Sequence, residues 1–490
     1  MSMTSKMRKT IGIGMILSLS SIGISAQTIT YPEPVKAIYE NADKSAVLTK
    51  TVRPVIGIPD DENAGRHVME VNEAGGIALV IPRSEDPSTL REMAASLDGL
   101  ILENGIKADD PFGVLLFKAA SDRNVPILGD CELIRQINEG LRREQSTIGN
   151  CDELISKARI FKKAKEIQSR IFSIDSHCDL PDIYSDGYRV GKRSNNQASI
   201  QKMQEGGLDA AVLISYQWQR ALDDSSSRKA VDLCTKMIED AKKDVAANSE
   251  FAGIARTPEE ALSLKAEGKK AFFIAIENGY GIGNNVKNVD KYADMGVIYI
   301  TLCHMKDNAI CNTSDHRYGT DTLKGLTPFG RKVVREMNRK GIMVDVSHTS
   351  SGTFWDCIKY GKAPIICSHS GAKAIFRHDR NLTDDQLRAL AAKGGVIQVY
   401  ILSDFMGPDM KKVSLDDVMD HIDHCVKVAG IDHVGIGADF DGGGGVIGCN
   451  GDNDLINVTV KLLERGYSEE QIRKIWGGNF LRVMKEVQKK

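Results

Sequence analysis

The last two thirds of the chain alternate short apolar runs with segments of helical periodicity. Segments such as FGRKVVREMNRK and LDDVMDHIDHCVKVAG repeat apolar residues at the spacing of a helix. Eight strands and their helices in about 320 residues predict a (β/α)8 TIM barrel. A doubly wound sheet, which normally has fewer strands, is the alternative. The apolar runs that predict strands cover residues 171–174, 210–215, 271–276, 297–302, 342–346, 364–367, 395–400 and 433–437.

The first third has a shorter alternation of the same kind. The apolar runs VRPVIGI, IALVIP, DGLILENG and VPILGD are separated by helix-like segments such as RHVMEVNEAGG and LREMAASL. This pattern predicts a small doubly wound, flavodoxin-like α/β domain over residues 50–150. Its boundary with the barrel, expected over residues 165–490, is predicted near residue 155.

Composition narrows the class of protein. With 490 residues, two domains are expected, and 42% hydrophobic and 27% charged residues are typical of a soluble globular protein. The formal net charge of −2 gives no reason to expect nucleic acid or an anionic membrane as a partner. Ten irregularly spaced cysteines without a CxxC pair predict mostly buried thiols and exclude a cysteine-based zinc site.

The N-terminus has the pattern of a secretory signal over residues 1–26. Lys6, Arg8 and Lys9 precede an apolar run over residues 11–24, and Ser25 and Ala26 offer small residues for cleavage. A membrane anchor is the alternative, but the run is shorter than the roughly 20 residues that cross a bilayer. The C-terminal FLRVMKEVQKK has no apolar tail for a glycolipid anchor. We therefore expect a secreted or periplasmic protein without a membrane anchor.

Polar residues with metal-binding chemistry follow most of the predicted strands. A (β/α)8 barrel gathers the carboxyl ends of its strands around one mouth, where its active site lies. A single histidine at such a position is more often a cap or surface residue. Converging imidazoles and carboxylates suit zinc, and an open mouth suggests catalytic rather than structural metal. The residues are Asp175, His177, Asp179, Glu277, His304, His348, His369 and Asp439.

The spacing of these residues in the sequence suggests which of them would bind each of two metal ions. Side chains two apart on an extended chain point the same way, so His177 and Asp179 can bind one ion while Cys178 faces away. His348 and His369 come from successive strands and could hold a second ion. Glu277 has two oxygens and could bridge both. Two metals about 3.5 to 4 Å apart would ionise a water molecule near neutral pH.

The ordered motifs of this region resemble those of the membrane (renal) dipeptidases, in the metal-dependent amidohydrolase superfamily. The resemblance runs from about residue 170 to the C-terminus and implies a zinc-dependent dipeptidase that uses a metal-bridging hydroxide. The motifs are IDSHCDLP, GGLDAA, IENG, TLCH, GLTPFGRKVVREMNRKGIMVDVSH, PIICSHSGA, RHDRNLTDDQL, GIGADFDG and WGGNFLRV.

The resemblance also implies a role for each site residue. His304 resembles the histidine that polarises the scissile carbonyl, and Asp439 the acid that handles protons. Arg380 resembles the arginine that receives the carboxylate of the dipeptide, the alternative being a surface arginine paired with Asp379 or Asp384. The family has a tyrosine that contacts the substrate, and Tyr400 matches its position only to within one residue. The two zinc ions would be held by His177 and Asp179, by His348 and His369, and by Glu277 as the bridge.

The first domain resembles γ-glutamyl hydrolases of the glutamine-amidotransferase class. PVIGI, EAGGIALVIP, LDGLILENG and VPILGDCELIRQIN follow the order of that family, with Cys131 at the place of its nucleophile. Leu133 stands where a nucleophile elbow needs a small residue, and the half of the fold with the catalytic partners is missing. We expect a truncated, catalytically silent structural or interaction module.

Two other functions stay open at this point. The barrel could hydrolyse a lactam, an acyl-amino acid or another small amide, because fold and metal do not select the substrate. It could also be an inactive binding protein, although every expected ligand is present. The glycines 442–445 suggest only a flexible loop. The oligomeric state is open, with a homodimer as one alternative.

Overall fold

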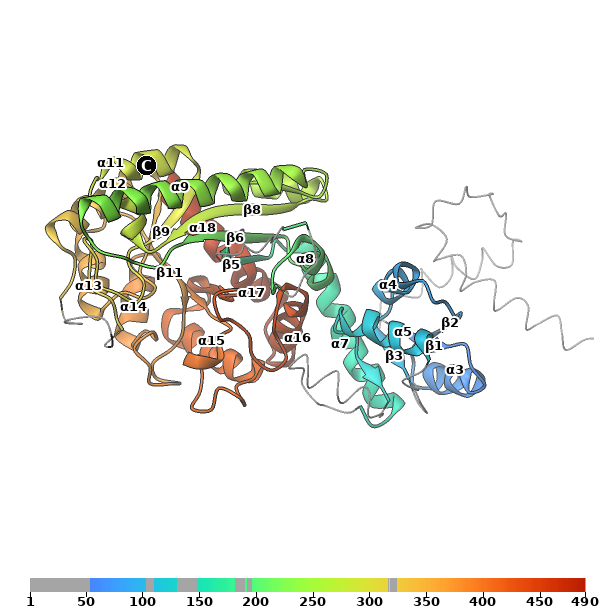
Figure 1. Cartoon of the computed structure of the whole chain (residues 1–490). Helices are drawn as coiled ribbons and strands as arrows, with labels where there is room; N and C mark the ends of the chain where they lie inside the picture. Colours follow the sequence, from blue (N-terminus) through green and yellow to red (C-terminus); the bar gives the residue numbers. More distant parts are fainter. Residues whose placement is uncertain are drawn as a thin grey trace, which may run out of the picture.

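The computed structural model describes residues 53–102, 110–129, 148–180, 190–191, 196–315, 317 and 324–489 (Figure 1). Eight parallel strands form the predicted barrel, in the order β13-β12-β11-β10-β9-β8-β6-β5. The seam between the first and last strands closes through a bridge from Cys178 to Phe440. The strands are β5 (Ile174–Leu180), β6 (Ala210–Tyr216), β8 (Lys270–Glu277), β9 (Val297–Thr301), β10 (Met343–Asp345), β11 (Ile365–Ser370), β12 (Val396–Val399) and β13 (Val434–Ile436).

The first strand differs from the prediction. The apolar run at 171–174 predicts the strand itself, but β5 begins at Ile174 and continues through His177 and Asp179. A search for apolar runs finds only the first residue of this strand, because several of its other side chains are polar and face the active site. A short extra strand, β7 (Ala252–Ile254), pairs with β8 beside the barrel and is also absent from the prediction.

Helices surround the barrel, and their ends follow local sequence signals. The predicted segment FGRKVVREMNRK forms most of α12 (Pro328–Lys340), which Thr327 caps by accepting from the Gly330 amide. Gly341 ends this helix at a φ of 75°, a left-handed conformation that favours glycine. The other helices of this region are α8 (Ile200–Gly206), α9 (Asp224–Ala247), α10 (Pro258–Ala266), α11 (Lys287–Asp294), α13 (Ser351–Tyr360), α14 (Asp384–Ala392), α15 (Leu415–Ala429), α16 (Ile456–Glu464), α17 (Glu469–Arg473) and α18 (Asn479–Gln488).

Alternate residues of the strands face two hydrophobic clusters. On β6, Ala211 and Leu213 pack in the larger cluster, which contains side chains of the surrounding helices. Val212 and Ile214 pack in a second cluster made mainly of strand residues, which fills the barrel interior. Both faces of the sheet are therefore buried, as expected for a parallel barrel.

The first domain is a parallel α/β unit with strand order β2-β1-β3-β4, the order that begins a flavodoxin-like sheet. Leu90 and Leu116 cover one face, and Val71 and Leu154 cover the other, which confirms the predicted doubly wound arrangement. The elements are β1 (Val55–Pro59), α3 (Ala64–Glu73), β2 (Ile77–Ile81), α4 (Pro87–Ala95), β3 (Gly99–Ile101), α5 (Pro111–Ser121), β4 (Ile127–Leu128) and α7 (Cys151–Arg170).

A single helix, α7, joins the α/β unit to the barrel (Figure 1). Ile155 packs on the sheet of the α/β unit, and Ile167 packs in the larger barrel cluster. The two parts are also linked by Asn124, whose amide donates to the Asn453 carbonyl at 2.9 Å. The predicted boundary near residue 155 therefore falls inside a helix that both parts share.

Some predictions concern residues outside the described ranges. The signal segment 1–26 and Cys131 lie there, so the resemblance of the α/β unit to γ-glutamyl hydrolases stays a prediction. Among the described helices, none is both long and apolar enough to span a bilayer. The nine described cysteines form no disulfide and eight are buried, which confirms the prediction of buried thiols.

Candidate active site

The barrel brings all the predicted ligands to the carboxyl ends of its strands. His177 and Asp179 lie within β5, Glu277 ends β8, and His369 lies within β11. His304, His348 and Asp439 lie in the segments after β9, β10 and β13. All are buried or half-buried. The predicted convergence at one mouth is thus present, with His177, Asp179 and His369 inside their strands rather than beyond them.

Glu277 occupies the centre of the cluster. Its Oε1 lies 3.0 Å from His348 Nε2 and 3.5 Å from His369 Nε2. Its Oε2 lies 3.7 Å from His177 Nε2. One carboxylate therefore faces imidazoles with each of its oxygens, which is the arrangement that a bridging ligand requires.

Three sets of side chains have ligand atoms within 4.8 Å of one another. Glu277 and His177 each belong to two of them. His348 Nε2 and His369 Nε2 lie 2.9 Å apart, so the pair expected to share an ion also converges. The sets are His177, Glu277 and His369; Glu277, His304 and His348; and His177, Asp179 and Asp439.

The donors fit a bound cation. His177 Nε2 and Asp179 Oδ1 are buried, and neither has a hydrogen-bond partner among the described residues. Buried polar atoms are normally paired, so two such atoms beside Glu277 indicate a missing ligand. Cys178, between them in sequence, packs in the core as the alternation predicts. Imidazole and carboxylate donors of this kind suit zinc.

An outer layer of hydrogen bonds orients the histidines. Tyr299 Oη lies 2.9 Å from His177 Nδ1, and Ser368 Oγ lies 2.9 Å from His369 Nδ1. Ser368 in turn donates to Asp345 Oδ2 at 2.6 Å. These contacts leave the Nε2 atoms for a metal, as second-sphere partners commonly do. Sequence analysis missed all three residues, although Asp345 is a conspicuous acid inside the apolar run 342–346.

Burial and neighbouring charges set the protonation of the site. Burial, together with the charge of Arg380, holds the pKa of His348 well below its usual value, and burial does the same for His369. Both are therefore neutral, the form that binds metal. Burial raises the pKa of Asp439 to about 6. Burial lowers the pKa of His177, but the Glu277 carboxylate outweighs it and raises the value to about 10, so His177 would have to release a proton to bind a metal ion.

The backbone is strained where the site residues leave their strands. Asn278, His348 and Asp439 have φ values of 73°, 64° and 63°. Non-glycine residues rarely adopt positive φ, and such residues concentrate at functional sites. These three residues follow β8, β10 and β13, so strained backbone occurs at three separate places around the mouth.

Arg380 is buried beside the cluster. Only 7% of it is exposed, and Nε, Nη1 and Nη2 have no hydrogen-bond partner among the described residues. The alternative of a surface arginine is wrong, because Asp379 pairs with Lys373 at 3.0 Å and Asp384 with His424 at 2.8 Å. A buried guanidinium with three unused nitrogens indicates a site for an anionic group.

Tyr400 lies behind Arg380 in the core. It is fully buried, and its hydroxyl donates to Asn381 Oδ1. Asn381 also donates to the carbonyls of Phe376 and Phe405, both at 2.9 Å. Tyr400 thus supports the segment that carries Arg380.

Two aromatic residues at the carboxyl end of β6, Tyr216 within the strand and Trp218 just after it, contact His304 and were missed by the sequence analysis. Tyr216 Oη lies 3.4 Å from His304 Nδ1. The Trp218 ring lies 6.4 Å from the His304 ring and is 42% exposed. Two aromatic residues at the carboxyl end of a predicted barrel strand are a signal that could have identified them.

The glycines after β13 are part of the site rather than only a flexible loop. A Cβ at Gly442 would lie 1.8 Å from Asp179 Oδ2 and 2.7 Å from Asp439 Oδ1. A Cβ at Gly444 would lie 2.5 Å from the Asp439 carbonyl oxygen. Close approach of the backbone to two acids therefore requires glycine here.

Known proteins share this barrel. A dipeptidase of Schizosaccharomyces pombe, described as uncharacterised, is 38% identical over 229 residues, 46% of this chain and 55% of that protein. Dipeptidase tcpJ of Claviceps purpurea is 34% identical over 236 residues, 48% of this chain and 55% of that protein. The chain thus spans about half the length of these relatives.

Solved structures cover the same region. The probable dipeptidase PvdM from Pseudomonas aeruginosa has a TM-score of 0.64 and 29% identity, over 68% of this chain and 99% of that one. A metallopeptidase from Rhodobacter sphaeroides, liganded with a phosphinate mimic of L-Ala-D-Ala, has a TM-score of 0.60 and 22% identity, over 65% and 99%. At 22% identity, the similarity to this metallopeptidase shows only that the fold is shared.

The family model described as membrane dipeptidase, peptidase family M19, matches residues 161–490. This range includes every strand of the barrel and every residue of the cluster around Glu277. The chain belongs to the membrane dipeptidase family.

Proposed function

We propose that the protein is an exported, zinc-dependent dipeptidase that binds two zinc ions. The observation that carries the proposal is Arg380, a buried guanidinium without a hydrogen-bond partner among the described residues, beside a cluster of histidines and carboxylates. Its charge contributes to lowering the pKa of His348 and His369. The guanidinium therefore lies close enough to the cluster to act on its charges.

Arg380 selects the substrate. A guanidinium holds a carboxylate through two parallel charge-assisted hydrogen bonds. Because the contact is close to the Glu277 cluster, the free carboxylate must lie near the scissile bond. This requirement favours a dipeptide over a longer peptide.

The metal ligands are the predicted set. His177 and Asp179 would hold one zinc ion, His348 and His369 would hold the other, and Glu277 would be shared between them. When bound, zinc would acidify a water molecule and polarise the peptide carbonyl.

His304 and Asp439 act on the reacting groups. Burial lowers the pKa of His304, so its ring is neutral and carries one N–H. With Tyr216 beside its Nδ1, His304 donates a hydrogen bond to the oxygen of the scissile carbonyl as negative charge develops there. Asp439, with a pKa of about 6, accepts a proton from the attacking water and returns it to the departing amine.

A substrate panel tests the proposal. The purified protein is assayed on a free dipeptide, its C-terminal amide, an N-acetyl-amino acid and a tripeptide. We expect the free dipeptide to be hydrolysed fastest, activity to disappear with a chelator, and zinc to restore it. Bound zinc, measured by elemental analysis, should approach two ions per chain. Equal rates on the free and amidated dipeptides would favour a general amidase, and active protein without metal would exclude the mechanism.

Export is part of the proposal. The predicted signal over residues 1–26 supports a secreted or periplasmic location. Fractionation of expressing cells should recover a chain whose N-terminus follows Ala26. Recovery of an intact chain from the cytoplasm would contradict this location.

A further inference from the structure

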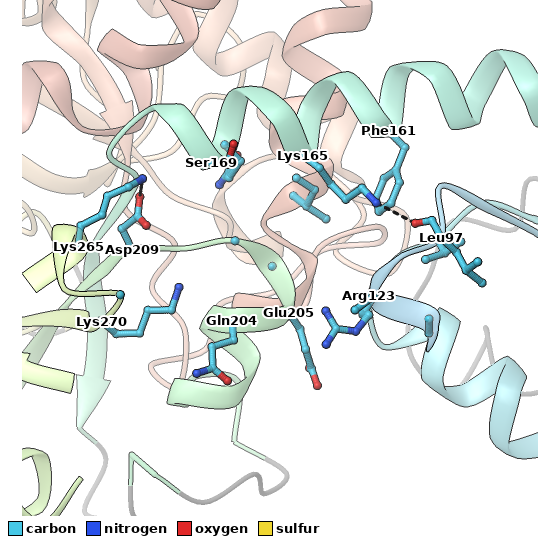
Figure 2. A pocket seen from close by; sticks show the side chains of 18 of the residues that line it. Leu97, Arg123, Phe161, Lys165, Ser169, Gln204, Glu205, Asp209, Lys265 and Lys270 are labelled. Carbon is cyan, nitrogen blue, oxygen red and sulfur yellow. Dashed lines mark hydrogen bonds and ion pairs between the residues drawn. The ribbon is translucent and has the colours of Figure 1, made fainter. Parts of the chain in front are cut away.

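A cavity of about 350 Å³ lies between the α/β unit and the barrel. Figure 2 shows that residues of both parts line it. Lys270 begins β8 and lines the cavity, whereas Glu277 ends the same strand in the active site. The cavity is therefore at the opposite end of the barrel from the cluster, and its volume is within the range of small-molecule sites.

The lining is basic. Five cationic side chains and two carboxylates, those of Glu205 and Asp209, line the cavity, and two of the lysines pair with carboxylates outside the lining. In Figure 2 the charged ends of Lys270, on the barrel side, and Arg123, on the α/β side, are turned toward the space between the two parts. An excess of positive charge in a partly enclosed space attracts anions. The cations are Arg123, Lys165, Lys265, Lys269 and Lys270.

The lysines differ in their partners. Lys265 pairs with Asp209 at 2.7 Å, Lys165 with Asp98 at 2.7 Å and Lys269 with Glu267 at 3.3 Å. Lys270 Nζ donates to the Leu208 carbonyl at 2.6 Å, and no carboxylate in the described ranges forms an ion pair with it. Burial lowers the pKa of Lys270, and the nearby charge of Asp209 offsets only part of this effect.

A neutral donor also lines the cavity without a partner. Gln168 is only 2% exposed, and its Oε1 accepts a hydrogen bond from Thr459 Oγ1. Its Nε2 is buried and has no hydrogen-bond partner among the described residues. A buried amide N–H is normally paired, so this one indicates an acceptor that the protein itself does not supply.

We propose that this cavity is a binding site for a small organic anion, held by Lys270, Gln168 and Arg123. The ligand carries an oxyanion group, either a phosphate monoester or a dicarboxylate, because both supply several acceptors and at least one full negative charge to lysine ammonium groups. Since residues of both parts contact the ligand, binding also stabilises the docking of the α/β unit on the barrel.

Calorimetry on the full chain tests the site. Glycerol 3-phosphate and glutarate serve as the phosphate and dicarboxylate probes, and neutral glycerol and sodium chloride at matched ionic strength serve as controls. We expect one of the anions to bind at one site per chain while both controls give no signal. Binding of the phosphate alone, or of the dicarboxylate alone, identifies the oxyanion group.

Matched variants locate the site. Lys270→Gln should weaken binding by about 10-fold or more, the loss expected for a charge-assisted contact. Lys242→Gln is the control, because Lys242 is another half-buried lysine that donates to a backbone carbonyl, that of Met295, away from the cavity. It should bind the anion like the wild type. Lys270→Gln should leave the unfolding temperature and the rate of dipeptide hydrolysis unchanged, which would show that this variant is folded.

Two results would overturn the proposal. One is the absence of binding by either anion to the wild-type protein up to about 10 mM. The other is equal affinity in the wild-type and Lys270→Gln proteins, which would indicate binding elsewhere on the surface.

Discussion

Asp98 in the α/β unit and Asp179 in the barrel are both buried carboxylates next to parallel strands, but their surroundings differ. Asp98 precedes β3 and accepts from the Val55 amide at 2.9 Å, from Lys162 at 3.2 Å and from Lys165 at 2.7 Å. Asp179 lies near the carboxyl end of β5, and its Oδ1 has no hydrogen-bond partner among the described residues. Burial and Glu277 raise its pKa well above the usual value.

The difference distinguishes a buried acid that stabilises the fold from a buried acid that belongs to a ligand site. A buried charge whose partners are all supplied by the protein stabilises the fold around it, and removing a partner is costly. A buried acid left without a partner, among other groups with shifted pKa values, is a sign of a ligand site. Substitutions in the barrel mouth should therefore reduce activity, and substitutions around Asp98 should reduce stability.

Glu277→Gln should give the largest loss. The amide keeps the volume but loses the charge that faces imidazoles on both sides, so both zinc ions should bind more weakly. We expect kcat/KM for a dipeptide to fall by about 10³-fold or more, with the unfolding temperature of the zinc-free protein unchanged or raised. Steady-state kinetics and calorimetric unfolding measure the two effects. A loss smaller than that of His177→Ala would contradict the bridging role.

Arg380→Ala should remove recognition of the substrate carboxylate. For a free dipeptide we expect kcat/KM to fall by roughly 10 to 1000-fold, given about 1.5 to 3 kcal/mol for a hydrogen bond to a charged group. The variant should show a much smaller fall in kcat/KM for the amidated dipeptide. The effects of amidating the substrate and of Arg380→Ala should therefore not be additive. Additive losses would mean that Arg380 contacts another part of the substrate.

Gly442→Ala should disturb the site through one methyl group. Its Cβ would collide with Asp179 Oδ2, at 1.8 Å, so the acid has to move. We expect roughly 10 to 100-fold weaker zinc binding, measured by competition with a chelator. Gly65→Ala, in α3, is the control, since a Cβ there has no atom within 4 Å. That change should leave zinc binding intact and stabilise α3 by about 0.5 to 1 kcal/mol.

Tyr299→Phe should have a smaller effect. The variant loses the hydroxyl 2.9 Å from His177 Nδ1, while Ser368 Oγ stays 3.2 Å from the same atom. We expect a loss of about 10-fold in zinc affinity or activity, at the low end for second-sphere partners, because Ser368 can replace part of the contact. The double variant with Ser368→Ala should lose more than either single variant.

Asp98→Asn should leave activity unchanged and lower stability. The amide cannot pair with Lys162 and Lys165, whose side chains are 25% and 33% exposed and therefore keep part of their hydration. We expect a loss of about 1 to 3 kcal/mol in the free energy of unfolding. Denaturant titration and a dipeptide assay test both halves of the prediction. A drop in kcat/KM above about 2-fold would show that the α/β unit influences the active site.

The features of this protein that its sequence predicts are those that depend on local patterns. Apolar runs and helical periodicity predict the barrel and the α/β unit, because strands and helices bury different faces at fixed intervals. The alternation of His177, Cys178 and Asp179 likewise predicts which side chains share a face. The ligand set follows from residue type at strand ends, because a barrel gathers those ends at one mouth.

Only the tertiary structure decides which polar groups find partners. Tyr299 reaches His177 across 122 residues of sequence, and the backbone of Gly442 approaches Asp179 through the seam between β5 and β13. Arg380 is identified in the sequence only by a family motif, yet folding buries it without a hydrogen-bond partner among the described residues, while Asp98 receives two lysines. Periodicity reports the environment of a residue along its own element, whereas hydrogen bonding and burial depend on elements that meet only when the chain has folded.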